Sequence, residues 1–132
     1  MKVQAELIYN ANAGRYAVRR EMDYVADYLE RHGWTVIIHE TGAPLEATAL
    51  ARQAAARGAD VVIAAGGDGT VNEVAGGLAH TNAALGVLPV GTTNVWALQM
   101  RIPALNPLGP APGLARWMST LEEQMDYTLP IN

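Results

Sequence analysis

The stretch at residues 60–65 constrains the fold of this chain most, because every position after its aspartate is apolar. A strand with one face in water alternates apolar and polar residues, whereas a strand covered by helices on both faces of a parallel sheet is apolar throughout. Residues 3–9, 34–39 and 84–90 are also rich in aliphatic and β-branched side chains, so each is a further strand candidate. The sequence therefore predicts a mainly parallel sheet with helices on both faces.

The segments between these strands carry apolar residues at the spacing of an amphipathic helix. Gly33 and Gly58 follow two of the segments and are expected to end those helices, since glycine is favoured just beyond a helix C-terminus. Alternating strands and helices predict an α/β fold, a three-layer doubly wound structure with right-handed crossovers. The three apolar stripes are Val18, Met22, Val25 and Leu29; Ala47, Leu50, Ala51 and Ala54; and Val71, Val74, Ala75 and Leu78.

Length and composition limit the class of protein. A chain of 132 residues has room for about one domain, and 50% apolar residues with 17% charged residues exclude a disordered chain. The absence of cysteine removes disulfides and thiolate metal sites, and a net charge of -4 disfavours nucleic acid as a partner. The apolar runs are far shorter than the roughly 20 residues of a membrane-spanning helix, and the start lacks a signal peptide. We therefore expect a cytoplasmic protein.

The last third of the sequence reads differently. Prolines at 103, 107, 110 and 112 exclude a regular helix or central strand there and predict a loop. A final helix is expected to follow, with an apolar face formed by Leu114, Trp117, Met118 and Leu121. Residues 126–132 then have the pattern of an extended segment.

An acid among glycines follows the strand candidate at residues 60–65, in the sequence GGDGT at residues 66–70. Glycines let a ligand approach the backbone closely. Thr70 is expected to cap the next helix and Glu73 to complete a capping box, so that this helix points N–H groups and the positive end of its dipole into the loop. The Asp68 carboxylate would repel phosphate unless a cation lay between them, so Asp68 is predicted to bind Mg²⁺ carried by a nucleotide, directly or through water.

The same sequence has a simpler interpretation, a tight turn with an exposed aspartate, and capping alone explains Glu73. Two other loops favour the nucleotide. The fourth strand leads into a glycine followed by Thr92 and Thr93, and the first strand leads into Asn10 and then Arg15, which could reach phosphate. Because the carboxyl ends of parallel strands meet at one edge, the three loops together predict a nucleotide cleft.

Three motifs resemble one family of enzymes. GGDGTVNEV, a later P-x-GTTN and an earlier N-x-x-A-G-R are similar, over residues 10–132, to the catalytic N-terminal domain of the diacylglycerol kinase and sphingosine kinase family of lipid kinases. The GGDGT core is shared with NAD kinases and related to 6-phosphofructokinases, whereas the TVNEV continuation and the later G-T-x-N favour the lipid kinases. The resemblance implies the NAD kinase-like fold of diacylglycerol kinase N-terminal domains.

The resemblance also implies cofactors and site residues, namely ATP and Mg²⁺ with Asp68 as the catalytic residue that organises the metal. The residues implied in ATP binding are Asn10, Thr41, Gly66, Gly67, Asp68, Gly69, Thr70, Val71, Asn72, Thr92 and Asn94, with Arg15, Glu73 and Thr93 in support. The sequence departs from the family where Ala11 replaces the usual proline and Val95 replaces a frequent aspartate. Both departures affect positions next to nucleotide-binding residues.

The resemblance divides the chain into two parts. Residues 1–124 correspond to the nucleotide-binding α/β domain, and residues 125–132 to the start of a linker toward a β-rich C-terminal domain, which in the family holds the general base and part of the acceptor pocket. The chain is expected to be either part of a two-domain enzyme or a single-domain relative without the base. By itself it is expected to bind nucleotide weakly and to turn over poorly.

The resemblance thus implies transfer of the γ-phosphoryl group of ATP to the hydroxyl of a lipid such as diacylglycerol or a sphingoid base, met peripherally at the inner membrane surface. One alternative is an NAD kinase-like phosphotransferase. Another is a non-catalytic module that senses nucleotide or merely assembles with itself as a homo-oligomer.

Overall fold

A computed structural model of the chain describes residues 2–10, 18–89, 118–119 and 121–122. Within these residues the elements follow one another as β1 (Gln4–Asn10), α1 (Val18–Arg31), β2 (Thr35–Thr41), α2 (Glu46–Ala56), β3 (Val61–Gly66), α3 (Asp68–Leu78) and β4 (Ala84–Pro89). None of the helices in this part of the chain is long and apolar enough to cross a membrane. The proline-rich loop, the extended segment and the division at residue 125 lie outside the described residues and stay predictions.

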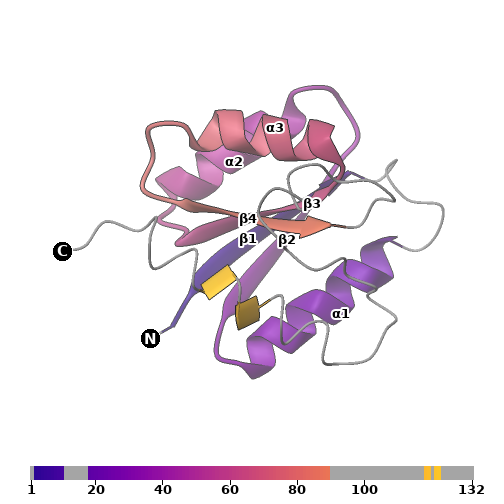
Figure 1. The fold of residues 1–132 in the computed structure, drawn as a ribbon, viewed down its shortest axis with the longest axis vertical. Helices are drawn as coiled ribbons and strands as arrows, with labels where there is room; N and C mark the ends of the chain where they lie inside the picture. The colour runs from indigo at the N-terminus through magenta and orange to yellow at the C-terminus, as the bar shows by residue number, and fades with distance from the viewer. Residues whose placement is uncertain (1, 11–17, 90–117, 120, 123–132) are drawn as a thin grey trace.

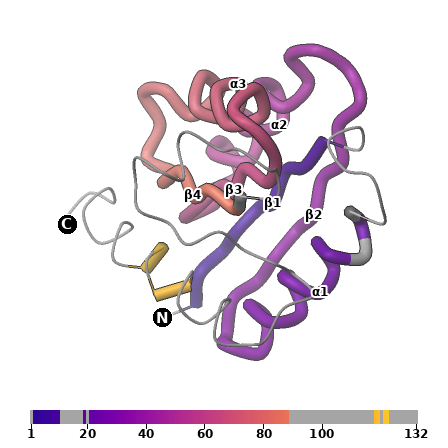
Figure 2. Tube along the Cα trace, turned by 45° about the vertical axis from the view of Figure 1, so that its right-hand side comes forward, coloured from indigo at the N-terminus to yellow at the C-terminus, as the bar shows by residue number. Residues whose placement is uncertain are grey.

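The strands form one parallel sheet in the order β2-β1-β3-β4. Figure 2 shows β1 and β2 running side by side in the same direction. In Figure 1, α1 covers one face of the sheet, and α2 and α3 cover the other. This is the three-layer, doubly wound α/β arrangement that the sequence predicts, and that prediction is confirmed.

The apolar stripes meet at the sheet. Every residue of β3 is buried, as the unbroken apolar run predicts. Most stripe residues of the three helices are buried too, and Leu50 and Ala75 are half-buried, whereas the side chain of Val18 is not described. Met118 and Leu121 are helical and buried in the same core, which confirms two of the four residues predicted for the apolar face of the last helix.

Backbone hydrogen bonds set the ends of the strands and helices more closely than the hydropathy pattern does. β1 and β2 continue to Asn10 and Thr41, beyond the predicted ends at residues 9 and 39, because these polar residues still pair in the parallel ladder. Gly33 and Gly58 have φ of +91° and +90°, and the residue after each donates its N–H to a carbonyl of the last helical turn. Both glycines therefore end helices as predicted.

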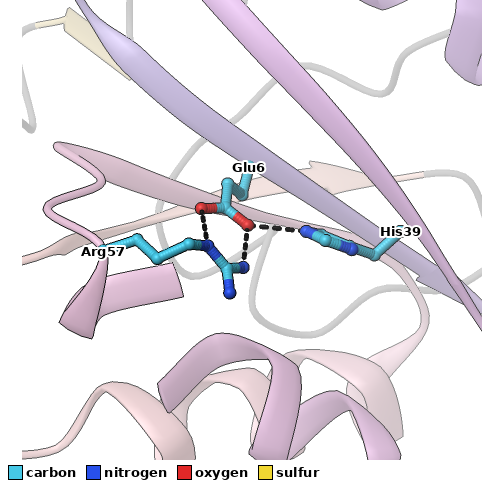
Figure 3. Close-up of polar contacts among 3 residues, drawn as sticks. All are labelled: Glu6, His39 and Arg57. Carbon is cyan, nitrogen blue, oxygen red and sulfur yellow. Dashed lines mark hydrogen bonds and ion pairs between the residues drawn. The ribbon is translucent and has the colours of Figure 1, made fainter. Parts of the chain in front are cut away.

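A buried carboxylate joins β1 and β2 to the residue that directly follows α2 (Figure 3). Glu6 of β1 is 4% exposed, and its two oxygens accept hydrogen bonds from Arg57 Nε at 3.2 Å and Nη2 at 2.5 Å. His39 Nε2 of β2 lies 2.6 Å from Glu6 Oε1. Burial would raise the pKa of Glu6, but the hydrogen bonds from Arg57 and His39 outweigh it, and the pKa lies below its ordinary value. Glu6 thus stabilises the fold in its ionised form.

We expect Glu6→Gln to lower the free energy of unfolding at neutral pH by about 1 kcal/mol, because a charge-assisted hydrogen bond is lost. The carboxyl of Glu6 has a lower pKa in the folded than in the unfolded chain, so its contribution is present above the ordinary pKa of 4.5 and is lost as the pH falls through the folded pKa. Urea unfolding over a pH series should therefore show a steeper acid loss in the unmodified protein than in the variant. Equal acid slopes would contradict this assignment, and Glu30→Gln, at an exposed position of α1, is the control.

Candidate functional site

The strand order places a site at the carboxyl edge of the sheet. The chain steps from β1 to β2 on one side, and later strands add on the other, so the order reverses between β1 and β3. In doubly wound sheets, ligands bind outside the carboxyl ends of the strands at this point of reversal. Asn10 ends β1 and Gly66 ends β3. The structure therefore brings the predicted Asn10 and the loop of residues 66–69, here called the GGDG loop, to the two sides of the reversal point.

The GGDG loop makes an abrupt change from strand to helix. Gly66 has a φ of +154°, which L side chains rarely adopt, and an added Cβ would lie 3.0 Å from Thr70 Oγ1. Gly67 is extended, with φ -86° and ψ -171°, and α3 begins at Asp68. The positive end of the α3 dipole therefore lies directly at the end of β3.

The predicted capping box is wrong. The N-cap of α3 is Gly67, a residue with no side chain of its own to cap the helix. Glycine is an acceptable N-cap, so the helix starts before Thr70, which becomes a buried residue of its first turn. Glu73 lies further along α3; its backbone oxygen accepts a 2.8 Å hydrogen bond from Thr48, and its Oε1 is buried without a hydrogen-bond partner in the described chain. As at any helix start, the first N–H groups of α3 are not used by hydrogen bonds within the helix itself.

Neither backbone conformation nor packing against the described residues requires glycine at two positions of the loop. Added Cβ atoms at Gly67 and Gly69 would meet no atom of the described residues within 4 Å, and neither residue has a positive φ. Gly69 lies in the first turn of α3, where glycine costs about 0.5–1 kcal/mol relative to alanine. The missing side chains leave room beside the start of a helix, which is what a phosphate group approaching the backbone requires.

The end of β2 lies beside the end of β1. Thr41 is 4% exposed, and its hydroxyl donates to the Tyr9 carbonyl oxygen at 3.3 Å. The Tyr9 hydroxyl donates to Glu40 Oε1 at 3.1 Å. Burial raises the pKa of Tyr9, and Glu40 acts in the same direction against the influence of Arg19, so this hydroxyl keeps its proton. Tyr9 and Glu40 were missed by the sequence reasoning, although each directly precedes a predicted site residue.

The structure places most of the predicted residues at or near this edge. Asp68 is half-buried at the start of α3, Asn72 is exposed one turn later, and the Val71 side chain faces the core, so only its backbone could meet a ligand. In the part of the chain that the structure describes, no three acidic or histidine side chains gather as a metal site. The remaining predictions lie outside the described residues; they are Arg15, Thr92, Thr93 and Asn94.

Comparison with known proteins gives consistent matches. The profile described as "Diacylglycerol kinase catalytic domain" matches residues 4–126. A diacylglycerol kinase of Bacillus subtilis (strain 168) is 43% identical over 102 residues, which make up 76% of this chain and 34% of the relative. A diacylglycerol kinase of Staphylococcus haemolyticus (strain JCSC1435) is 37% identical over 106 residues, 79% of this chain and 32% of the relative. The chain thus spans about a third of the length of these relatives.

The structural comparison agrees with the sequence matches. The crystal structure of a diacylglycerol kinase from Bacillus anthracis str. Sterne superposes with a TM-score of 0.71 at 26% identity, over 90% of this chain and 42% of that chain. The α/β fold described above is therefore shared with that kinase, as the resemblance of the motifs implies.

Proposed function

The chain belongs to the diacylglycerol kinase catalytic domain family, and on this premise we propose that it forms the nucleotide-binding part of a lipid kinase, which transfers the γ-phosphoryl group of ATP to a lipid hydroxyl. The observation that carries the proposal is the space left among the described residues at Gly67 and Gly69, beside the start of α3 and at the reversal point of the sheet. This place suits the triphosphate that we propose, since backbone N–H groups and a helix dipole favour anions.

Asp68 is the residue we propose to hold Mg²⁺ on the nucleotide. Its carboxylate begins α3, within the loop whose glycines leave room for phosphates. Oxygen ligands suit Mg²⁺, which usually binds through one or two carboxylates together with substrate phosphates and water. When bound, the ion neutralises charge on the transferring phosphoryl group. The chain's own contribution is to fix the position of the triphosphate, which is most of what catalysis of this reaction demands.

The acceptor side of the reaction is proposed from the family. The relatives named diacylglycerol kinase are about three times as long as the matched region, and we propose that the general base and the lipid pocket belong to a β-rich domain that follows the linker starting at residue 125. Diacylglycerol is the acceptor that these names favour over a sphingoid base. Such a kinase would work in the cytoplasm and meet its lipid peripherally at the inner membrane surface.

The direct test is an acceptor screen with radiolabelled ATP and Mg²⁺ on the full-length protein. Labelled phosphatidic acid from diacylglycerol vesicles would support the proposal. Label on NAD and none on lipid would instead establish an NAD kinase-like phosphotransferase. Nucleotide binding without transfer to any acceptor would establish a non-catalytic module.

Gly69→Ala separates the proposed role of the GGDG loop from its role in folding. Alanine is the better helix former and its Cβ meets open space, so the variant should be more stable by about 0.5–1 kcal/mol. The same methyl group would occupy the space proposed for phosphate, so we expect affinity for MgATP to fall by about tenfold, on the order of one lost hydrogen bond to a charged group. Urea unfolding and titration calorimetry measure the two effects.

Gly76→Ala is the matched control, because Gly76 is exposed on the same helix and an added Cβ there also meets open space. It should gain similar stability and keep its affinity for MgATP. Unchanged affinity in both variants would remove Gly69 from the nucleotide site.

A further inference from the structure

A polar contact outside the GGDG loop fastens the last residues of β1 and β2 to each other. Tyr9 and Glu40 face each other in the parallel register, and Asn10 and Thr41 are the next pair toward the carboxyl edge. The Tyr9 hydroxyl donates to Glu40 Oε1 at 3.1 Å, while the Tyr9 carbonyl oxygen accepts from the Thr41 hydroxyl at 3.3 Å. Tyr9 is therefore bound to β2 through its side chain and also through its backbone, directly before Asn10.

Burial of apolar area does not explain the Tyr9 hydroxyl. Tyr9 is 1% exposed, and phenylalanine would bury the same ring without the cost of desolvating a hydroxyl. The hydroxyl is retained with an acceptor on the neighbouring strand, and Arg19, in the first turn of α1, acts on it as well. What the hydroxyl adds is a fixed orientation of one strand end relative to the next.

The Thr41 side chain is also held by a hydrogen bond between the two strands. Its hydroxyl is the donor to the Tyr9 carbonyl, since a carbonyl oxygen can only accept. The side chain of Thr41 thus contacts β1. The hydrogen bond of the Tyr9 hydroxyl to Glu40 and that of the Thr41 hydroxyl to the Tyr9 carbonyl together hold the ends of β1 and β2 at the Asn10–Thr41 pair.

From these contacts we propose that Tyr9 and Glu40 are positioning residues, which hold Asn10 and Thr41 where the nucleotide meets the carboxyl edge. The inference rests on the proposed function and deepens it, because it extends the site to a pair of residues that touch no ligand. A site whose groups are held by such supporting contacts loses affinity when the support is removed, even though every contacting residue is still present.

The test compares variants of the chain by titration calorimetry with MgATP. Tyr9→Phe removes only the hydroxyl, and Glu40→Ala removes only its acceptor; each should weaken binding by about three- to tenfold, the equivalent of one hydrogen bond. The double variant should lose no more than either single variant, since both break the same contact. Glu40→Gln keeps an acceptor oxygen and should restore nearly full affinity. Tyr24→Phe, at an exposed position of α1, is the matched control and should bind as the unmodified chain does.

A merely structural role predicts something else, a lower free energy of unfolding with unchanged affinity, and that result would overturn the proposal. Amide NMR spectra without nucleotide supply a second readout, in which the Asn10 and Thr41 resonances should move in Tyr9→Phe and stay in place in Tyr24→Phe. If the unmodified chain binds no MgATP, the proposed function fails for this chain, and the NMR comparison still decides whether Tyr9 positions Asn10. Unmoved Asn10 and Thr41 resonances would overturn the positioning role by themselves.

Discussion

Asp68→Asn in the full-length protein should lower kcat for phosphoryl transfer by at least about two orders of magnitude. The substitution keeps the size and the hydrogen-bonding shape of the side chain and removes its charge, and a neutral amide is a poor ligand for Mg²⁺ compared with a carboxylate. Because Asp68 is half-buried at the first position of α3, the fold should tolerate the change. The measurement is the steady-state rate of label transfer from ATP to diacylglycerol vesicles over a series of rising Mg²⁺ concentrations.

The control for this result is Asp27→Asn, which makes the same chemical change on the exposed side of α1, where Asp27 pairs with Arg31. Its kcat should equal that of the unmodified protein, because an exposed ion pair contributes little to the stability of the fold. If Asp68→Asn turned over at the unmodified rate, Asp68 would have no part in the mechanism. If higher Mg²⁺ concentrations restored the lost rate, Asp68 would still be a metal ligand. Its effect would then be on the affinity for Mg²⁺.

The sheet was predictable from the sequence because burial on both faces leaves a local signature. The apolar run in β3 and the helical stripes can be read without knowing what they pack against. The ends of β1 and β2 were harder, since Asn10 and Thr41 are polar and join the ladder only because a neighbouring backbone is present. Strand pairing depends on backbone hydrogen bonds, which hydropathy does not report.

The candidate site divides in the same way. The GGDG loop is contiguous, so its glycines and Asp68 were visible in the sequence, but the helix start was misplaced. The spacing of Thr70 and Glu73 matches a capping box and pointed to Thr70 as the cap, and only the turn at Gly66 shows that α3 begins earlier. The contact of Tyr9 with Glu40 depends on which strands are neighbours, and strand order is a tertiary property that the sequence pattern does not contain.

A second large effect is expected where α2 and α3 touch. Gly77 lies on α3 where this helix packs against α2, and an added Cβ would be 2.3 Å from the Thr48 carbonyl oxygen and 2.8 Å from Ala51 Cβ. The first of these is a backbone atom, which cannot rotate away as a side chain can. The hydrogen bond from the Thr48 hydroxyl to the Glu73 carbonyl, at 2.8 Å, ties the same two helices and would have to lengthen if they moved apart. Gly77 is therefore required by packing.

Gly77→Ala should consequently lower the free energy of unfolding by about 2–4 kcal/mol, because overpacking outweighs the roughly 1 kcal/mol that alanine gains in a helix. Gly76→Ala, one residue earlier with open space around its Cβ, should raise stability by about 0.5–1 kcal/mol. The opposite signs at adjacent residues are what urea unfolding of the two variants must show. Equal changes in the free energy of unfolding would mean that α2 and α3 are not in contact at Gly77. The packing described here, which orients α3 toward the carboxyl edge, would then be wrong.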